Sequence, residues 1–116
     1  MGVSVLGSDE RSGEMITSEP RVLSVISPCH NESEVIQLFY DELVQVLGTL
    51  EDLNTEIILV DDGSTDATLS IINRIAQADP RVRVCSFSRN FGHQIALTAG
   101  LDCAVGDGVI MMDCDL

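Results

Sequence analysis

Apolar residues along the chain follow two patterns, short continuous runs and stripes with helical spacing. Between the runs, apolar residues recur every three or four positions, which predicts helices that begin near Ser33, after Asp66 and at His93. Strands and helices therefore alternate with short connections, which predicts an α/β fold: a parallel sheet with helices on both faces. The four predicted strands are residues 22–27, 56–60, 82–86 and 108–112, and the nearly all-apolar run 56–60 is typical of a strand covered on both faces.

Turn-forming and helix-capping residues mark the ends of these elements. Pro28 is predicted to end the first strand, because proline cannot donate a hydrogen bond to the sheet. Asp66 or Ser64 can cap the start of the second helix. Gly63 is expected to supply a backbone conformation that other residues resist.

With 116 residues, the chain has room for about one small domain. Residues 1–20 are rich in glycine, serine and glutamate without sustained periodicity, which predicts a flexible arm. The domain is then expected to span residues 21–116. Because residues 112–116 read as a strand end followed by an interrupted motif, we expect the chain to be an N-terminal fragment.

In parallel sheets of this kind, ligands bind beyond the carboxyl ends of the strands. The segments that follow these ends are polar, charged or glycine-containing, whereas the strands before them are apolar. They are residues 28–32, 61–66, 86–92 and 113–116. The sequence therefore predicts a binding site where these four segments meet.

Asp113 and Asp115 come directly after the fourth apolar run. In an extended segment, residues two apart point the same way, so both carboxylates can face one site. Adjacent carboxylates repel each other, and a divalent cation such as Mg²⁺ or Mn²⁺ relieves the repulsion. The pattern favours a metal site, and the alternative is a cap for a further helix.

Asp61 and Asp62 follow the second run in the same way. A carboxylate there can accept hydrogen bonds from a nucleobase or ribose, or the pair can simply shape the turn. Asn31 and Glu32 begin the first helix, where asparagine is a common cap and glutamate suits the helix dipole. Arg89 can meet a phosphate or pair with a neighbouring carboxylate.

Other enzyme classes find little support. His30 lies on the predicted ligand side and His93 is expected to form local hydrogen bonds, but neither has the serine or cysteine partner of a hydrolase triad. The glycine-rich phosphate loops of P-loop enzymes and dinucleotide dehydrogenases are absent from the sequence. A phospho-acceptor receiver domain is disfavoured, because the acidic pair follows the second strand and the chain has no lysine.

The charge balance is strongly acidic, with 19 aspartate and glutamate residues, six arginines and a formal net charge of −13. Binding of nucleic acid or of an anionic membrane by this segment is disfavoured, since both need a basic face. The four cysteines lack zinc-ligand spacing and are expected to be free thiols in a reducing compartment. The sequence contains no bilayer-spanning run and no signal-peptide pattern, so we expect a cytoplasmic location.

Together the motifs resemble those of the family 2 glycosyltransferases. The resemblance is closest to the branch that acts on polyprenyl phosphates, such as dolichol-phosphate mannosyltransferases and bactoprenol glucosyltransferases. It covers residues 21–116. The segments that carry it are residues 27–32, 57–68, 88–93, 99–102 and 112–116.

The resemblance implies the nucleotide-binding half of a type A, Rossmann-like glycosyltransferase fold and a nucleoside-diphosphate sugar donor. Asp113 and Asp115 would hold Mg²⁺ or Mn²⁺ against the diphosphate. A lipid phosphate at the cytoplasmic face of a membrane would attack the anomeric carbon with inversion. With Arg89 added as the candidate phosphate contact, the expected donor-binding residues are Pro28, His30, Glu32, Val60, Asp61, Asp62, Arg89, Asp113 and Cys114.

The sequence departs from the family pattern at two positions. His30 stands where tyrosine is most common, and Cys114 replaces a common alanine. Catalytic residues, acceptor-side residues and any membrane helices would lie beyond Leu116, so no catalytic residue is assigned. The competing hypothesis is a non-catalytic nucleotide-binding fragment of such an enzyme. The sugar, the nucleobase and the acceptor lipid are left open.

Overall fold

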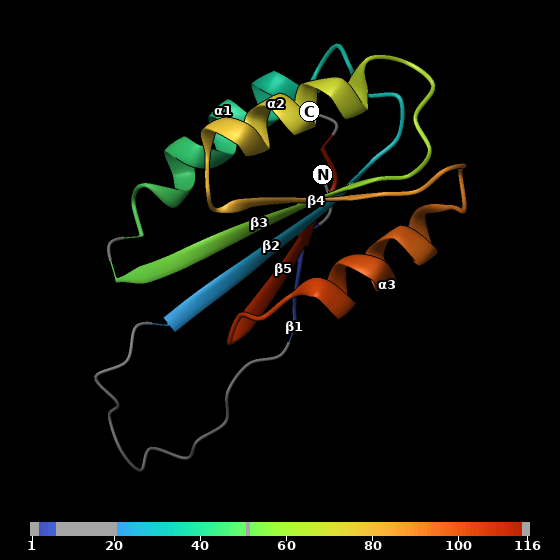
Figure 1. Ribbon diagram of the computed structural model, residues 1–116. Helices are drawn as coiled ribbons and strands as arrows, with labels where there is room; N and C mark the ends of the chain where they lie inside the picture. The colour runs from blue at the N-terminus through green and yellow to red at the C-terminus, as the bar shows by residue number, and fades with distance from the viewer. Residues whose placement is uncertain (1–2, 7–20, 51, 115–116) are drawn as a thin grey trace.

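The computed structural model describes residues 3–6, 21–50 and 52–114. Within them the chain forms a sheet in the order β1-β5-β2-β3-β4, together with helices α1, α2 and α3 (Figure 1). Strands β2 to β5 run parallel, and β1 pairs antiparallel with β5 at the edge. The predicted α/β class is confirmed. The elements are β1 (Val3–Leu6), β2 (Arg21–Cys29), α1 (Ile36–Leu47), β3 (Leu53–Asp61), α2 (Thr68–Ala78), β4 (Val82–Ser86), α3 (His93–Cys103) and β5 (Gly108–Met112).

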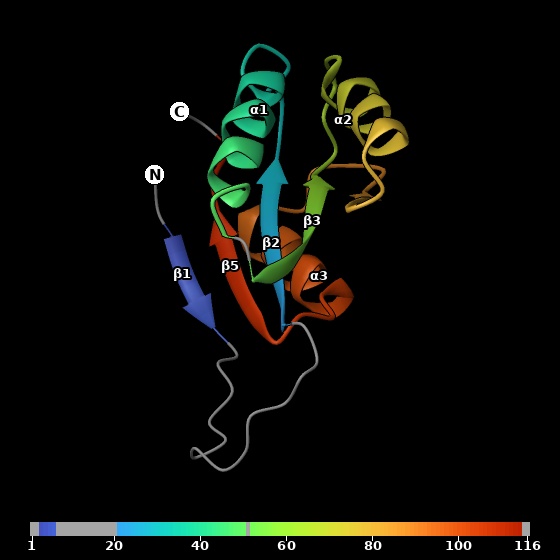
Figure 2. The ribbon, with the colours of Figure 1, turned by 90° about the vertical axis from the view of Figure 1, so that its left-hand side faces the viewer.

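Helices cover both faces of the sheet, with α1 and α2 on one side and α3 on the other (Figures 1 and 2). Successive residues of a strand point to opposite faces. On β3, Ile57 and Leu59 accordingly pack in the cluster beneath α1 and α2, whereas Ile58 and Val60 pack against α3. Both faces of β3 are therefore buried, which explains its continuous apolar run.

Strand β2 continues through Pro28 to Cys29, so the prediction that Pro28 ends it is wrong. Pairing of β2 with β5 stops at Ile26, while pairing with β3 continues to Cys29. The Cys29 carbonyl accepts a hydrogen bond from the Asp62 N–H, so the backbone polar groups of Cys29 point toward β3. Those of the preceding Pro28 point the other way, toward the side where pairing with β5 has already ended. The missing N–H of Pro28 therefore costs no hydrogen bond in the sheet.

Two other boundaries differ from the expectation. Helix α1 begins at Ile36 rather than near Ser33, because residues 33–35 form a turn that closes on the Glu32 carbonyl. Val3–Leu6 form strand β1, whereas the sequence placed them in a flexible arm. The other residues of that arm lie outside the described residues.

Helix α3 approaches the sheet closely because its contact face is built from small residues. Ala96 and Gly100 are its buried positions. A Cβ atom at Gly100 would overlap the side chain of Ile26 on β2. This close packing holds α3 against the sheet, with its first residue, His93, at the strand-end edge.

Toward the amino-terminal ends of the strands, a buried carboxylate holds the connection between α3 and β5. Glu56 Oε2 accepts hydrogen bonds from the Ser24 hydroxyl at 2.6 Å and the Val105 N–H at 2.7 Å, and Oε1 accepts one from Arg83 at 3.0 Å. Arg83 also donates to the Cys103 carbonyl at 2.8 Å. Burial alone would raise the pKa of Glu56, but these hydrogen bonds outweigh it and hold the pKa below its ordinary value.

We expect Glu56→Gln to lower the free energy of unfolding by about 1–3 kcal/mol at neutral pH, because an amide cannot replace a charged acceptor of three hydrogen bonds. The carboxylate contributes fully to the free energy of unfolding when the pH is above the pKa of Glu56 in the unfolded chain. This contribution is lost as the pH falls through the lower pKa of Glu56 in the folded chain. Urea denaturation from about pH 7 to about pH 3 should therefore show the two proteins converging in stability. A difference that stays constant over this range would contradict the role given to Glu56.

Candidate functional site

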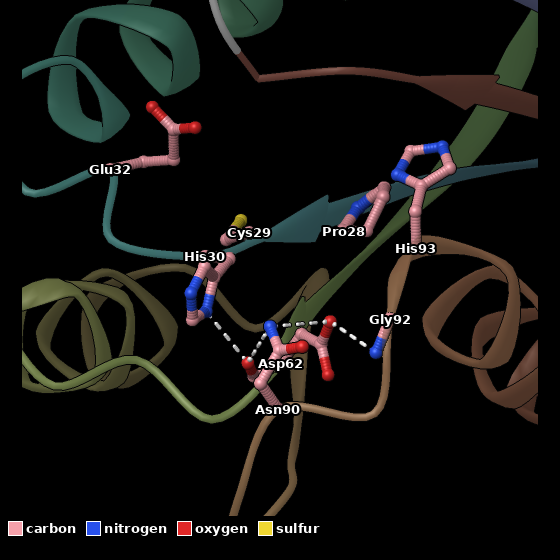
Figure 3. A pocket seen from close by; sticks show the side chains of 8 residues that line it. All are labelled: Pro28, Cys29, His30, Glu32, Asp62, Asn90, Gly92 and His93. Atoms are coloured by element: carbon pink, nitrogen blue, oxygen red, sulfur yellow. Dashed lines mark hydrogen bonds between the residues drawn. The ribbon is translucent and has the colours of Figure 1, made fainter.

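A cavity of about 300 Å³ opens at the carboxyl-terminal edge of the sheet (Figure 3). It is formed by the ends of β2 and β3 and by the loop that leads into α3. Three of the four predicted segments, residues 28–32, 61–66 and 86–92, are thus brought together. The volume is at the lower end of the range for small-molecule sites. The lining residues are Pro28, Cys29, His30, Glu32, Asp62, Asn90, Gly92 and His93.

Asp62 joins the walls of this cavity. Its Oδ1 accepts a hydrogen bond from the Phe91 N–H at 2.8 Å, and its Oδ2 accepts from the Gly92 N–H at 3.0 Å and the Asn90 amide at 3.2 Å. Its own N–H donates to the Cys29 carbonyl at 2.8 Å. Asp62 is only 3% exposed, and these donors offset the cost of burying its charge.

The His30 ring is oriented by the backbone of Asp62. Its Nδ1 lies 2.8 Å from the Asp62 carbonyl oxygen. Because a carbonyl can only accept a hydrogen bond, this geometry assigns the proton to Nδ1. Nε2 of the neutral ring is then an acceptor, and it lies 3.4 Å from the Asn31 amide nitrogen. His30 therefore presents one defined pattern of donor and acceptor at the cavity.

Asp61 faces the opposite side of the sheet from Asp62. By strand alternation it continues the row of Ile57 and Leu59, which pack beneath α1 and α2. It is 1% exposed, and within the described residues its Oδ1 has no hydrogen-bond partner. Asp61 does not line the cavity. Its role in nucleotide binding stays a prediction, and the geometry favours Asp62 for a direct contact.

Asp113 follows β5, and its carboxylate lies 3.6 Å from the His93 imidazole at the start of α3. The two side chains are 43% and 56% exposed, respectively. Since His93 lines the cavity, Asp113 lies beside its rim. Asp115, the second predicted metal ligand, lies outside the described residues. In the part of the chain that the structure describes, no group of three or more His, Cys, Asp or Glu side chains is placed to hold a metal ion.

The remaining predicted contacts lie around the cavity. Val60 is fully buried in the cluster against α3. Arg89 is exposed, and its guanidinium stacks 4.7 Å from the centre of the Phe91 ring. Cys114 is buried with its Sγ 3.7 Å from the Pro28 carbonyl oxygen. The binding roles of Val60, Arg89 and Cys114 stay predictions.

All four cysteines are free thiols, as the sequence predicts. A hydrogen bond with Cys114 and burial together raise the pKa of the Cys29 thiol well above its ordinary value. Cys29 therefore stays protonated at neutral pH and is a poor nucleophile. It contributes packing at the cavity wall rather than chemistry.

Cys29, Asn90, Gly92 and His93 also line the cavity, although the sequence singled out none of them as an individual binding residue. Asn90 and Gly92 reach the cavity because Asp62, 28 and 30 positions earlier, binds them. No local pattern reveals a contact of this kind. The available signal was their position in a polar, glycine-containing segment directly after a strand.

Comparison with known proteins gives the family. A family model described as glycosyl transferase family 2 matches residues 24–116. The match covers most of the chain, which therefore belongs to glycosyl transferase family 2. A bactoprenol glucosyl transferase of Shigella phage SfV is 49% identical over 94 residues, which are 81% of this chain and 30% of that protein. The chain thus spans less than a third of the length of this relative.

Solved structures of glycosyltransferases share the fold. A mannosyltransferase from Pyrobaculum calidifontis in complex with GDP-Man and Mn²⁺ matches with a TM-score of 0.70 at 26% identity, covering 84% of this chain and 28% of that one. The glucosyl-3-phosphoglycerate synthase of Mycobacterium tuberculosis, in complex with Mn²⁺ and UDP, matches with a TM-score of 0.64 at 32% identity, covering 83% and 34%. The expected type A glycosyltransferase fold is confirmed.

Gly63 allows the loop before α3 to pass directly over the turn after β3. Its φ is +67°, and a Cβ atom there would overlap the backbone of Arg89 and Asn90. The expected glycine conformation is therefore confirmed. Gly108 is a suitable comparison, because the nearest atom to a Cβ there is a Leu23 methyl carbon at 3.8 Å.

We expect Gly63→Ala to push the 89–92 loop away from Asp62 and to lower the free energy of unfolding by about 1–3 kcal/mol. Gly108→Ala should change the free energy of unfolding much less, because the new methyl group would make only ordinary van der Waals contact. Urea denaturation of both variants measures the difference. Equal effects of the two substitutions would show that the close approach at Gly63 carries no special strain.

Proposed function

We propose that the chain forms the donor-binding part of a glycosyltransferase that moves a sugar from a nucleoside diphosphate to a polyprenyl phosphate. The observation that carries the proposal is the cavity where His30, Glu32 and Asp62 converge beyond parallel strand ends. Family 2 membership supports the donor class. The name of the phage relative, a bactoprenol glucosyl transferase, supports the acceptor class.

The nucleoside occupies the end of the cavity beside β2 and β3. Three of the roughly four acceptor positions of the Asp62 carboxylate are used, which leaves one for a base N–H or a ribose hydroxyl. The Pro28 ring offers an apolar surface for a base, and the His30 ring lines the same end of the cavity. Glu32 lines the same wall and supplies a carboxylate for ribose.

The diphosphate lies toward Asp113 and His93. Asp113 offers an exposed carboxylate, the hard oxygen donor that Mg²⁺ and Mn²⁺ prefer. Mg²⁺ commonly binds through one or two carboxylates together with substrate phosphates and waters, so a single described carboxylate fits this mode. Asp113, with Asp115, would hold the ion. Such an ion, when bound, offsets the charge of the departing diphosphate.

Transfer breaks the bond between the anomeric carbon and the diphosphate oxygen, and a phosphate oxygen of the acceptor forms the new bond from the opposite side. The described residues bind and orient the donor in this scheme, and none of them is assigned to activate the acceptor. No helix among the described residues is long and apolar enough to cross a membrane. We propose that the lipid phosphate is met at the cytoplasmic face of a membrane.

We expect UDP or GDP with Mn²⁺ to raise the thermal midpoint of the chain. At about 100 times the dissociation constant, the nucleotide adds about 2.7 kcal/mol to the free energy of unfolding. Asp113→Asn should abolish the part of this shift that depends on Mn²⁺, because an amide is a poor ligand for a hard cation. Differential scanning fluorimetry with and without Mn²⁺ measures it.

Asp102→Asn is the matched control, since Asp102 is an exposed aspartate near the far end of α3. It should keep the full Mn²⁺-dependent shift. A full shift in Asp113→Asn would remove Asp113 from the metal site. A chain that binds neither nucleotide would overturn the proposed donor class.

A further inference from the structure

The loop after β2 is fastened to the loop after β3 at four consecutive residues. Each residue from 30 to 33 has a hydrogen bond across the gap, and we call this set the loop clasp. The pairs are the His30 ring with the Asp62 carbonyl at 2.8 Å, the Asn31 N–H with Ser64 Oγ at 2.9 Å, the Glu32 N–H with Thr68 Oγ1 at 2.8 Å and the Ser33 N–H with Asp66 Oδ2 at 3.2 Å.

Asp66 holds both sides of the clasp with one carboxylate. Its Oδ2 accepts from the Ser33 N–H, while its Oδ1 accepts from the Thr68 N–H at 2.9 Å and from the Thr68 hydroxyl. The Thr68 hydroxyl donates its O–H to Asp66, so its oxygen is left to accept a hydrogen bond from the Glu32 N–H. A continuous chain of hydrogen bonds runs from Asp66 to the backbone of a cavity residue.

The charge of Asp66 is retained at physiological pH. The hydrogen bond from the Thr68 hydroxyl, with further ones from the Thr68 and Ser33 N–H groups, lowers the pKa of Asp66 well below its ordinary value. The carboxylate lies two residues before the start of α2, and negative charge is favoured at helix N-termini.

The clasp also includes a residue with a left-handed backbone conformation. Asn31 has a φ of +53°, which is uncommon for a residue other than glycine. Its Oδ1 accepts a hydrogen bond from the Thr65 N–H at 2.8 Å, so the side chain reaches across the gap and does not cap α1. This left-handed residue lies between His30 and Glu32, and it sets the directions in which both enter the cavity.

The clasp uses three consecutive N–H groups at the start of the α1 segment. Those of Asn31 and Ser33 donate to side chains of the β3–α2 loop, and that of Glu32 donates to Thr68, the first residue of α2. Donors that are already paired are not available to a phosphate. The α1 end of the cavity is therefore closed to the diphosphate, which agrees with its placement toward His93 and Asp113.

We propose that Asp66 is a positioning residue of the nucleotide cavity, because its carboxylate fixes the loop that presents His30 and Glu32 to the ligand. The proposal rests on the proposed donor-binding function. A purely structural role is the alternative, in which Asp66 stabilises the fold and the cavity keeps its shape without it. If Asp66 is a positioning residue, its substitution weakens nucleotide binding more than an equally destabilising substitution elsewhere does. If its role is purely structural, the two substitutions weaken binding equally.

Asp79 provides the control, because it is a second hydrogen-bonded aspartate at the opposite end of α2. It accepts from the Arg81 N–H and guanidinium and from the Tyr40 hydroxyl, and Arg81 and Tyr40 hold its pKa below the ordinary value. The eleven residues of α2 place it about 16 Å from the clasp. Asp79→Asn should lower stability without touching the cavity.

The experiment compares Asp66→Asn, Asp66→Ser and Asp79→Asn by calorimetric titration with UDP and with GDP, each with Mn²⁺. Serine caps a helix about as well as aspartate, so Asp66→Ser keeps the start of α2 but cannot span both loops with one oxygen. We expect both Asp66 variants to weaken binding about tenfold or more, and Asp79→Asn to change it less than about twofold. Amide hydrogen exchange without ligand should quicken at residues 31–33 in the Asp66 variants only.

Each outcome decides the matter. Unchanged affinity in Asp66→Ser, or equal losses in the Asp66 and Asp79 variants, would overturn the positioning role and leave the proposed function standing. An unaltered chain that binds neither nucleotide would overturn the proposed function and the positioning role with it. If Asp66→Asn does not fold, Asp66→Ser carries the comparison alone.

Discussion

The carboxylate of Asp62 is the interaction on which the cavity depends. It stands at the end of a buried parallel strand, and its charge is nearly out of contact with water. A buried carboxylate is tolerated only when donors surround it, and here the donors are the amides of residues 90–92. Satisfying this one charge therefore folds the loop before α3 back over the ends of β2 and β3. The backbone carbonyl of Asp62 in turn orients the His30 ring.

Two adjacent aspartates thereby take different places in the structure. Asp62 turns toward α3 and the cavity, whereas Asp61 continues the row that packs beneath α1 and α2. The difference arises because successive side chains along β3 point to opposite faces of the sheet. A third acidic residue, Asp66, accepts hydrogen bonds from the Ser33 N–H in the turn before α1 and from the Thr68 N–H at the start of α2. The three aspartates of residues 61–66 therefore have different structural roles.

Sequence patterns predicted the parts of the fold that depend on local burial. The runs at 82–86 and 108–112 match β4 and β5, because polar or glycine residues bound a short apolar stretch. Strand β1 escaped prediction, since its pairing partner Met112 lies far along the chain. The strand-end rule located the cavity, but the clasp depends on a left-handed Asn31 and on contacts over more than thirty positions. Such contacts are set by the packed sheet and not by neighbouring residues.

We propose that a nucleoside diphosphate binds where the ends of β2 and β3 meet the start of α3. Backbone amide shifts of the ¹⁵N-labelled chain, recorded while UDP or GDP is added with Mn²⁺, test it most directly. We expect the largest changes at His30, Glu32, Asp62, residues 90–93 and Asp113. Changes confined to the opposite edge of the sheet around Glu56, or no saturable change with either nucleotide, would contradict it.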